Sequence, residues 1–87
     1  ILGYNLIMSF VIAVSRPEGL KYYDRLKQEF GAACILVSSK EELTLDFLNS
    51  VKPSYVFFPH WSYMIPKQIY EAYPCVIFHM TDLPFGR

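Results

Sequence analysis

The sequence contains four short apolar runs in which polar residues do not alternate with apolar ones. The runs lie at residues 10–14, 33–37, 55–58 and 75–78. A strand with one face in water shows such alternation, whereas a strand buried on both faces is apolar throughout. Strands of that second kind belong to parallel sheets that helices cover on both sides. We therefore expect an α/β fold with four parallel strands.

The segment between the first two runs has the periodicity of an amphipathic helix. Leu20, Tyr23, Leu26 and Phe30 recur at spacings of three and four residues, which places them on one helical face. Gly31 follows directly, and glycine is the usual residue just beyond a helix end. This pattern predicts a helix that ends at Gly31.

The next two segments carry helix start and stop signals. Ser39 and Glu42 have the spacing of a capping box, so we expect a helix to begin there and to end before Pro53. Pro66 suits the first residue of a third helix, and Pro74 ends that helix. The order βαβαβαβ with short connections predicts right-handed crossovers and a Rossmann-like, doubly wound parallel sheet.

Composition narrows the class of protein further. Apolar residues make up 53% of the 87 residues and aromatic residues 17%, which excludes an intrinsically disordered chain. Eight basic and eight acidic residues give a net charge of zero, so we expect no nucleic-acid partner that binds through a basic field. The apolar start, residues 1–14, is interrupted by Gly3, Asn5 and Ser9 and is too short to cross a membrane. We expect no membrane partner.

The two cysteines, Cys34 and Cys75, both lie inside apolar runs. Such thiols usually behave as small buried hydrophobic groups, whereas a disulfide framework has more cysteines in loops. This usage fits the reducing environment of the cytoplasm. Two histidines and two buried thiols do not form a metal-ligand pattern, so we expect no metal.

Familiar cofactor motifs are missing from the sequence. Residues 15–19 follow the first predicted strand and read Ser-Arg-Pro-Glu-Gly, which is not the glycine-rich turn of dinucleotide-binding proteins. The sequence also has neither a P-loop nor the G-x-S-x-G turn of hydrolases. These observations disfavour a nucleotide cofactor that is bound through a phosphate loop.

Reactive side chains follow the predicted strands. His60 comes after the third run and His79 after the fourth, and Ser15 and Arg16 follow the first. Because ligands of open α/β sheets bind at the carboxyl ends of the strands, these residues are candidates for a site. A structural role is the competing interpretation, and we favour it for His60.

Two stretches together resemble the folate-dependent formyltransferase family, which includes methionyl-tRNA formyltransferase and sugar N-formyltransferases. That family carries Asn-x-His-x-Ser-Leu-Leu-Pro at the end of a central strand, and His79, Thr81, Leu83 and Pro84 match it with Thr in place of Ser. The earlier stretch 61–67 ends in Ile-Pro-Lys, similar to the Leu-Pro-Lys of the family. The resemblance covers the second half of the chain well and the first half in its general pattern.

The resemblance implies transfer of a formyl group from 10-formyltetrahydrofolate to an amine. The catalytic residues would be His79, which stabilises the oxyanion or moves a proton, and Thr81, which fixes the imidazole or the loop. The acceptor would be a small-molecule amine, such as a nucleotide-linked amino sugar, or an aminoacyl-tRNA. Arg16 is a candidate for binding a phosphate or carboxylate of that substrate. The expected folate-binding residues are Trp61, Ser62, Tyr63, Met64, Ile65, Pro66, Leu83, Pro84, Phe85 and Gly86.

The sequence departs from the family pattern at one important position. Ile77 stands where the family has Asn, and alternation along the strand puts positions 77 and 79 on the same face. The alternative function is therefore a non-catalytic or degenerate Rossmann-like binding module. A response-regulator-like or flavodoxin-like domain is a weaker alternative, since the acidic cluster or phosphate loop is missing.

The resemblance also sets the expected domain organisation. Residues 1–87 correspond to the N-terminal half of a formyltransferase domain, truncated at its C-terminus. The catalytic Asp of the family lies further downstream, and Asp82 is not its equivalent. We expect the 87 residues alone to be inactive.

Overall fold

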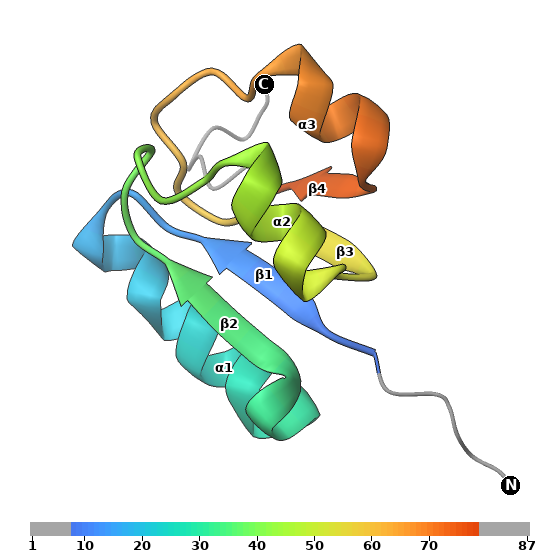
Figure 1. Cartoon of the computed structure of the whole chain (residues 1–87). Coiled ribbons are helices and arrows are strands. Elements are labelled where there is room, and N and C mark those ends of the chain that lie inside the picture. The colour runs from blue at the N-terminus through green and yellow to red at the C-terminus, as the bar shows by residue number, and fades with distance from the viewer. Residues whose placement is uncertain (1–7, 79–87) are drawn as a thin grey trace, which may run out of the picture.

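The computed structural model describes residues 8–78, and this part of the chain alternates strands and helices as predicted (Figure 1). A turn of 3-10 helix, η1 (Pro17–Gly19), precedes α1, and a second, η2 (Gly31–Ala33), follows it. The remaining elements, in chain order, are β1 (Phe10–Ala13), α1 (Leu20–Phe30), β2 (Cys34–Val37), α2 (Leu45–Val51), β3 (Tyr55–Phe58), α3 (Lys67–Ala72) and β4 (Cys75–Ile77).

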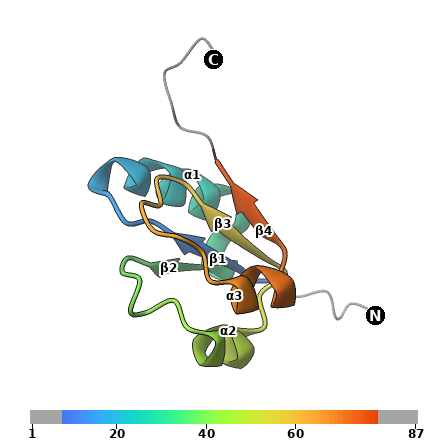
Figure 2. The ribbon, with the colours of Figure 1, turned by 90° about the horizontal axis from the view of Figure 1, so that it is seen from above.

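The four strands form one sheet in the order β2-β1-β3-β4, and every neighbouring pair is parallel. The chain steps from β1 to β2 on one side, then crosses back over β1 to β3 and continues to β4. Helix α1 covers one face of the sheet, while α2 and α3 cover the other (Figure 2). The predicted doubly wound parallel sheet is confirmed.

The central strand β1 is buried along its whole length, as its unbroken apolar sequence predicts. Alternate side chains enter two separate cores. Ile12 packs with Cys34 under α1, whereas Val11 packs with Leu48 and Ile69 under α2 and α3. Burial of both faces thus holds for β1.

Strand β4 differs from that expectation. It lies at the edge of the described sheet, and Val76 and Ile77 are 36% and 58% exposed. An apolar run predicts a strand, but it does not tell a central strand, which is buried, from a strand at the edge of the sheet.

The end of α1 lies where the sequence predicts it. Gly31 has a φ of 67°, a backbone conformation that side-chain-bearing residues rarely adopt, and its N–H donates to the carbonyl oxygen of Lys27. The helix therefore ends at a glycine, the residue that adopts a positive φ most easily.

The predicted start of α2 at Ser39 is wrong. The Glu42 carboxylate accepts from the Ser39 N–H, as a capping box requires, but the chain then turns instead of forming a helix. The helix begins after Thr44, whose Oγ1 accepts from the Phe47 N–H at 3.0 Å. The reason is topological. The chain leaves the carboxyl end of β2 and must first reach the face of the sheet, and only then can α2 cross over β1.

Candidate functional site

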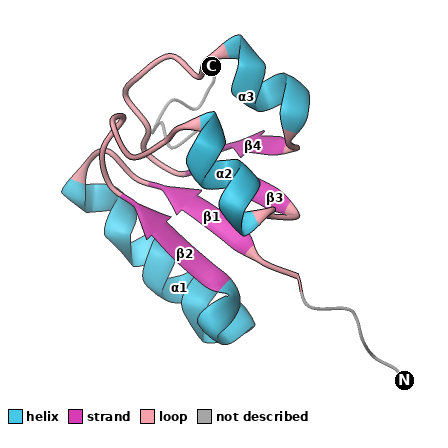
Figure 3. Ribbon diagram, in the orientation of Figure 1, coloured by secondary structure: helices cyan, strands magenta, loops and turns pink. Residues whose placement is uncertain are grey.

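The loops that follow β1, β2 and β3 gather at one end of the sheet (Figure 3). They do so because parallel strands present all their carboxyl ends at the same edge. The strand order reverses between β1 and β3, since the chain after β1 leads to α1 on one face and the chain after β3 leads to α3 on the other. In open α/β sheets this reversal point is where ligands bind.

Ser15 and residues 60–62 meet at this reversal point. The Ser15 N–H donates to the His60 carbonyl oxygen at 3.1 Å, and the Ser15 hydroxyl donates to the same oxygen at 3.0 Å. The hydroxyl oxygen also accepts from the Ser62 N–H at 2.8 Å. One serine therefore joins the loop after β1 to the loop after β3.

His60 has a backbone role in this arrangement. Its φ is 56°, which is unusual for a residue other than glycine, and its ring stacks on Tyr22 of α1 with centroids 5.7 Å apart. Gly19 packs against the same turn so closely that a Cβ there would lie 3.0 Å from His60 Cβ. These contacts agree with the structural interpretation of His60.

The predicted folate-binding loop, residues 61–66, divides into inward and outward side chains. Trp61 and Ile65 pack against the core under α2 and α3. Ser62, Tyr63, Met64 and Pro66 are exposed, and Met64 is 91% exposed. The loop therefore presents an anchored indole and a row of accessible groups at the carboxyl edge of the sheet.

The Trp61 ring makes edge contacts with Phe58 and Tyr63, at centroid distances of 5.7 Å and 5.5 Å. Its indole N–H is buried and has no hydrogen-bond partner within the described residues. The Lys40 ammonium lies 5.1 Å from the centre of the Tyr63 ring, so the loop after β2 contacts the outer part of the same loop. Sequence reasoning missed Lys40, because nothing local to it indicates a partner that distant in the chain.

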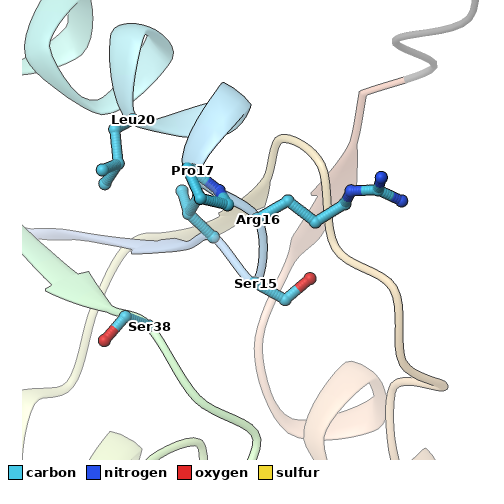
Figure 4. A pocket seen from close by; sticks show the side chains of 6 residues that line it. Ser15, Arg16, Pro17, Leu20 and Ser38 are labelled. Atoms are coloured by element: carbon cyan, nitrogen blue, oxygen red, sulfur yellow. The ribbon is translucent and has the colours of Figure 1, made fainter.

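Arg16 lines a pocket of about 210 Å³ next to the reversal point (Figure 4). Leu20 and Ser38 form the other side of the pocket, and the Arg16 side chain points away from both. Its guanidinium is 3.8 Å from the carboxylate of Glu18, and both side chains are more than half exposed. The Arg16 guanidinium is therefore accessible to solvent and lies outside the pocket that its residue lines.

A second pocket, of about 370 Å³, lies along the open edge of β2. It is lined by Ile35, Leu36, Val37, Glu42 and Phe47. None of these residues belongs to the reversal point, so this pocket is separate from the candidate site.

Both thiols are free, and burial raises the pKa of Cys34 and the pKa of Cys75. Cys34 is buried and Cys75 is half-buried, which agrees with their expected role as small hydrophobic groups.

Within residues 8–78, no three His, Cys, Asp or Glu side chains gather as they would around a metal ion. None of the helices in that range has the length and hydrophobicity that a membrane crossing requires.

The remaining predicted site residues lie outside the described part of the chain. They are His79, Thr81, Leu83, Pro84, Phe85 and Gly86. The structure does describe the strand that leads to them, in which Ile77 is paired in register with Phe58. The carboxyl end of β4 is thus next to that of β3, from which the loop 61–66 begins.

Ile77 shares the face of Phe58, because residues paired in register on parallel strands point to the same side. This is the face that α2 and α3 cover and into which Trp61 packs. An exposed apolar side chain therefore occupies the position at which the formyltransferase pattern has Asn.

No family model matches the chain, and no curated protein is similar enough to be counted a match. Among solved structures, the methionyl-tRNA formyltransferase from Clostridium thermocellum is similar in both sequence and fold. The two share 41% identity with a TM-score of 0.76, and the match covers 92% of this chain and 36% of the other. The chain thus spans about a third of that relative. Over nearly all of its length, this α/β chain is formyltransferase-like.

Proposed function

We propose that the protein transfers a formyl group from 10-formyltetrahydrofolate to an amine. The observation that carries this proposal is the 41% identity to a methionyl-tRNA formyltransferase over 92% of the chain. The shared part includes the carboxyl edge of the sheet, where ligands of this fold class bind. Since this part spans about a third of the relative, we propose that residues 1–87 are the N-terminal part of a larger catalytic domain.

The loop 61–66 would form one wall of the folate site. The half-buried indole of Trp61 and the exposed residues Ser62, Tyr63 and Met64 would supply apolar and hydrogen-bonding groups, which together suit a pterin ring. Leu83, Pro84, Phe85 and Gly86 would complete the opposite wall. The two walls would follow β3 and β4, which are neighbours in the sheet.

In the proposed reaction the amine attacks the formyl carbon, and the bond from that carbon to the folate nitrogen then breaks. A negative charge develops on the formyl oxygen in between. The amine gives up one proton, and the folate nitrogen takes one up as it leaves. His79 would stabilise the oxygen or transfer that proton, because imidazole exchanges protons near neutral pH. Thr81 would hold the imidazole or the loop in place.

Two acceptors are in question, a small amine such as a nucleotide-linked amino sugar and an aminoacyl-tRNA. The solved relative is named for methionyl-tRNA. The 41% identity to that relative favours the aminoacyl-tRNA, whereas the net charge of zero over the 87 residues, which supplies no basic field for RNA, favours the small amine. Arg16, which is exposed beside its pocket, would bind a phosphate or carboxylate of the substrate. The free thiols fit a reducing compartment, and we propose the cytoplasm.

One observation favours a second function, that of a binding module without catalysis. Ile77 cannot donate a hydrogen bond to a formyl oxygen, and losing one such donor typically raises a reaction barrier by about 3–4 kcal/mol. A protein that bound the folate without transferring the formyl group would fit this substitution.

The test compares the full-length protein with two matched variants of it, His79→Asn and His60→Asn. Asparagine tolerates the left-handed backbone of His60 and removes the imidazole in both cases. Calorimetry with a stable 10-formyl folate analogue measures binding, and chromatography of the formylated amine measures transfer. We expect His79→Asn to lower the transfer rate about 10²–10⁴-fold and His60→Asn to leave it within a few-fold.

The outcomes separate the hypotheses. Absence of folate binding by the unmodified polypeptide rejects the proposed function. Binding without transfer to either class of amine selects the binding module. An equal loss of transfer in both variants assigns no special role to His79.

A further inference from the structure

Ser15 makes three hydrogen bonds to the backbone of residues 60 and 62. The His60 carbonyl oxygen accepts from both the N–H and the hydroxyl of Ser15, and the Ser62 N–H donates back to the hydroxyl oxygen. Ser62 lies 47 positions further along the chain, so this contact depends on the sheet and not on local sequence.

The turn that Ser15 holds is one that the chain does not favour by itself. His60 has the left-handed φ of 56°, which is disfavoured for a residue with a Cβ. Such a conformation persists where its surroundings impose it. Here the surroundings are the two bonds to the His60 carbonyl oxygen and the close packing of Gly19.

Trp61 lies between the two residues that Ser15 binds. With the residues on either side restrained, the direction in which the indole leaves the backbone is set, and the ring meets Phe58 and Tyr63. If the bonds to Ser15 were lost, the hydrogen bonds that restrain His60 and Ser62 on either side of Trp61 would be lost with them.

We propose that Ser15 is a positioning residue that fixes the orientation of the loop 61–66, and of Trp61 in particular, for binding the formyl donor. Its hydroxyl need not touch the donor, because it acts through the backbone of residues 60 and 62. This inference rests on the proposed function for its ligand, but the hydrogen bonds that it invokes are tested separately below.

The first test compares Ser15→Ala with Ser15→Thr in the polypeptide as its gene encodes it. Alanine removes the hydroxyl, whereas threonine keeps it and serves as the conservative rescue. We expect Ser15→Ala to raise KM for the formyl donor about tenfold, with kcat within about twofold, because a loop that must be ordered on binding weakens affinity. We expect Ser15→Thr to restore KM to within about threefold.

The second test reports on Trp61 directly and needs no catalysis. Subtracting the emission of a Trp61→Phe polypeptide isolates the Trp61 signal. We expect this difference emission to shift to longer wavelength and to become more accessible to iodide in Ser15→Ala, but not in Ser15→Thr. The urea midpoint of each variant shows whether it is folded under the conditions of measurement.

A third measurement requires no variant at Ser15. Hydrogen exchange of the Ser62 amide is expected to be slow in the unmodified polypeptide, although its side chain is exposed. Exchange as fast as in an open loop, or unchanged Trp61 emission and unchanged KM in folded Ser15→Ala, would overturn the inference. If the unmodified polypeptide binds no folate, the proposed function fails, while the emission and exchange results still decide whether Ser15 orients the loop.

Discussion

Gly19 lies where η1 meets the turn after β3, and the structure predicts that even one added methyl group will disturb this contact. A Cβ built on Gly19 would lie 2.7 Å from Val14 Cγ1, 2.9 Å from the Pro59 carbonyl oxygen and 3.0 Å from His60 Cβ. Pro59 directly precedes His60, whose carbonyl oxygen accepts from Ser15, so Pro59 cannot move away without displacing the turn. Gly19→Ala therefore tests how tightly the reversal point is packed.

The expected loss of stability follows from two opposing effects. Adding a methyl group to a well-packed site typically costs about 1–3 kcal/mol through displaced neighbours. Replacing glycine by alanine reduces the entropy of the unfolded chain and offsets about 0.4–1 kcal/mol of this. Since the contacts at 2.7 and 2.9 Å place the crowding cost in the upper part of its range, about 2–3 kcal/mol, we expect Gly19→Ala to lower the free energy of unfolding by about 1–2.5 kcal/mol.

Gly31→Ala is the matched control for this prediction. No atom lies within 4 Å of a Cβ placed on Gly31, but its φ of 67° is unfavourable for alanine, so we expect destabilisation from the backbone and not from crowding. Urea unfolding measures both losses, and the emission of Trp61 distinguishes their causes. It should change in Gly19→Ala and stay constant in Gly31→Ala. A fully stable Gly19→Ala protein with unchanged Trp61 emission would refute the packing argument.

Two further predictions concern the loop before α2. Thr44→Ala should cost about 1 kcal/mol of stability in urea unfolding, because Thr44 Oγ1 caps the helix, whereas Thr44→Ser should cost less; equal losses would contradict the capping role. The Ser38 N–H, together with that of Ser39, lowers the pKa of Glu42, so the ionised carboxylate stabilises the folded state. The stability difference between the unmodified protein and Glu42→Gln should be complete above roughly pH 5, where glutamate is ionised in both states, and should vanish as the pH falls through the lowered pKa. A difference independent of pH would show that the charge of Glu42 has no such role.

The sheet and its order of elements could be predicted because their signals are local. An unbroken apolar run predicts a buried strand, and the periodic stripe that ends at Gly31 predicts α1. The start of α2 could not be placed in this way. Ser39 and Thr44 are both good cap residues, and the sequence pattern favours Ser39 because of Glu42. Which of the two begins the helix depends on the position of the chain relative to the sheet after β2, and that position is set by the whole fold.

The candidate site shows the same division. The sequence predicts that residues directly after a strand, such as His60, lie at the carboxyl edge of the sheet, and the structure places His60 and the loop 61–66 that follows it there. The bonds from Ser15 to that loop were not predicted, because their partners are backbone groups more than forty positions away. The only signal in the sequence was a hydroxyl residue directly after the first strand, and turn statistics explain such a residue equally well.

The reversal of strand order explains why a serine is well suited to this position. After β1 the chain turns to the face of α1, and after β3 it turns to the opposite face, so the two backbones separate just beyond the sheet. The Val14 N–H still donates to Val37 of β2, but the Ser15 N–H and the His60 carbonyl oxygen that follow have no neighbouring strand as partner, although they lie beside the buried residues Val14 and Pro59. Buried peptide groups need hydrogen-bond partners. Ser15 provides one acceptor and two donors at that point. It thereby joins the loop after β1 to the loop after β3 where the two begin to separate. At the reversal point, where ligands of this fold class bind, the short polar side chain of Ser15 thus supplies the partners that the sheet no longer provides.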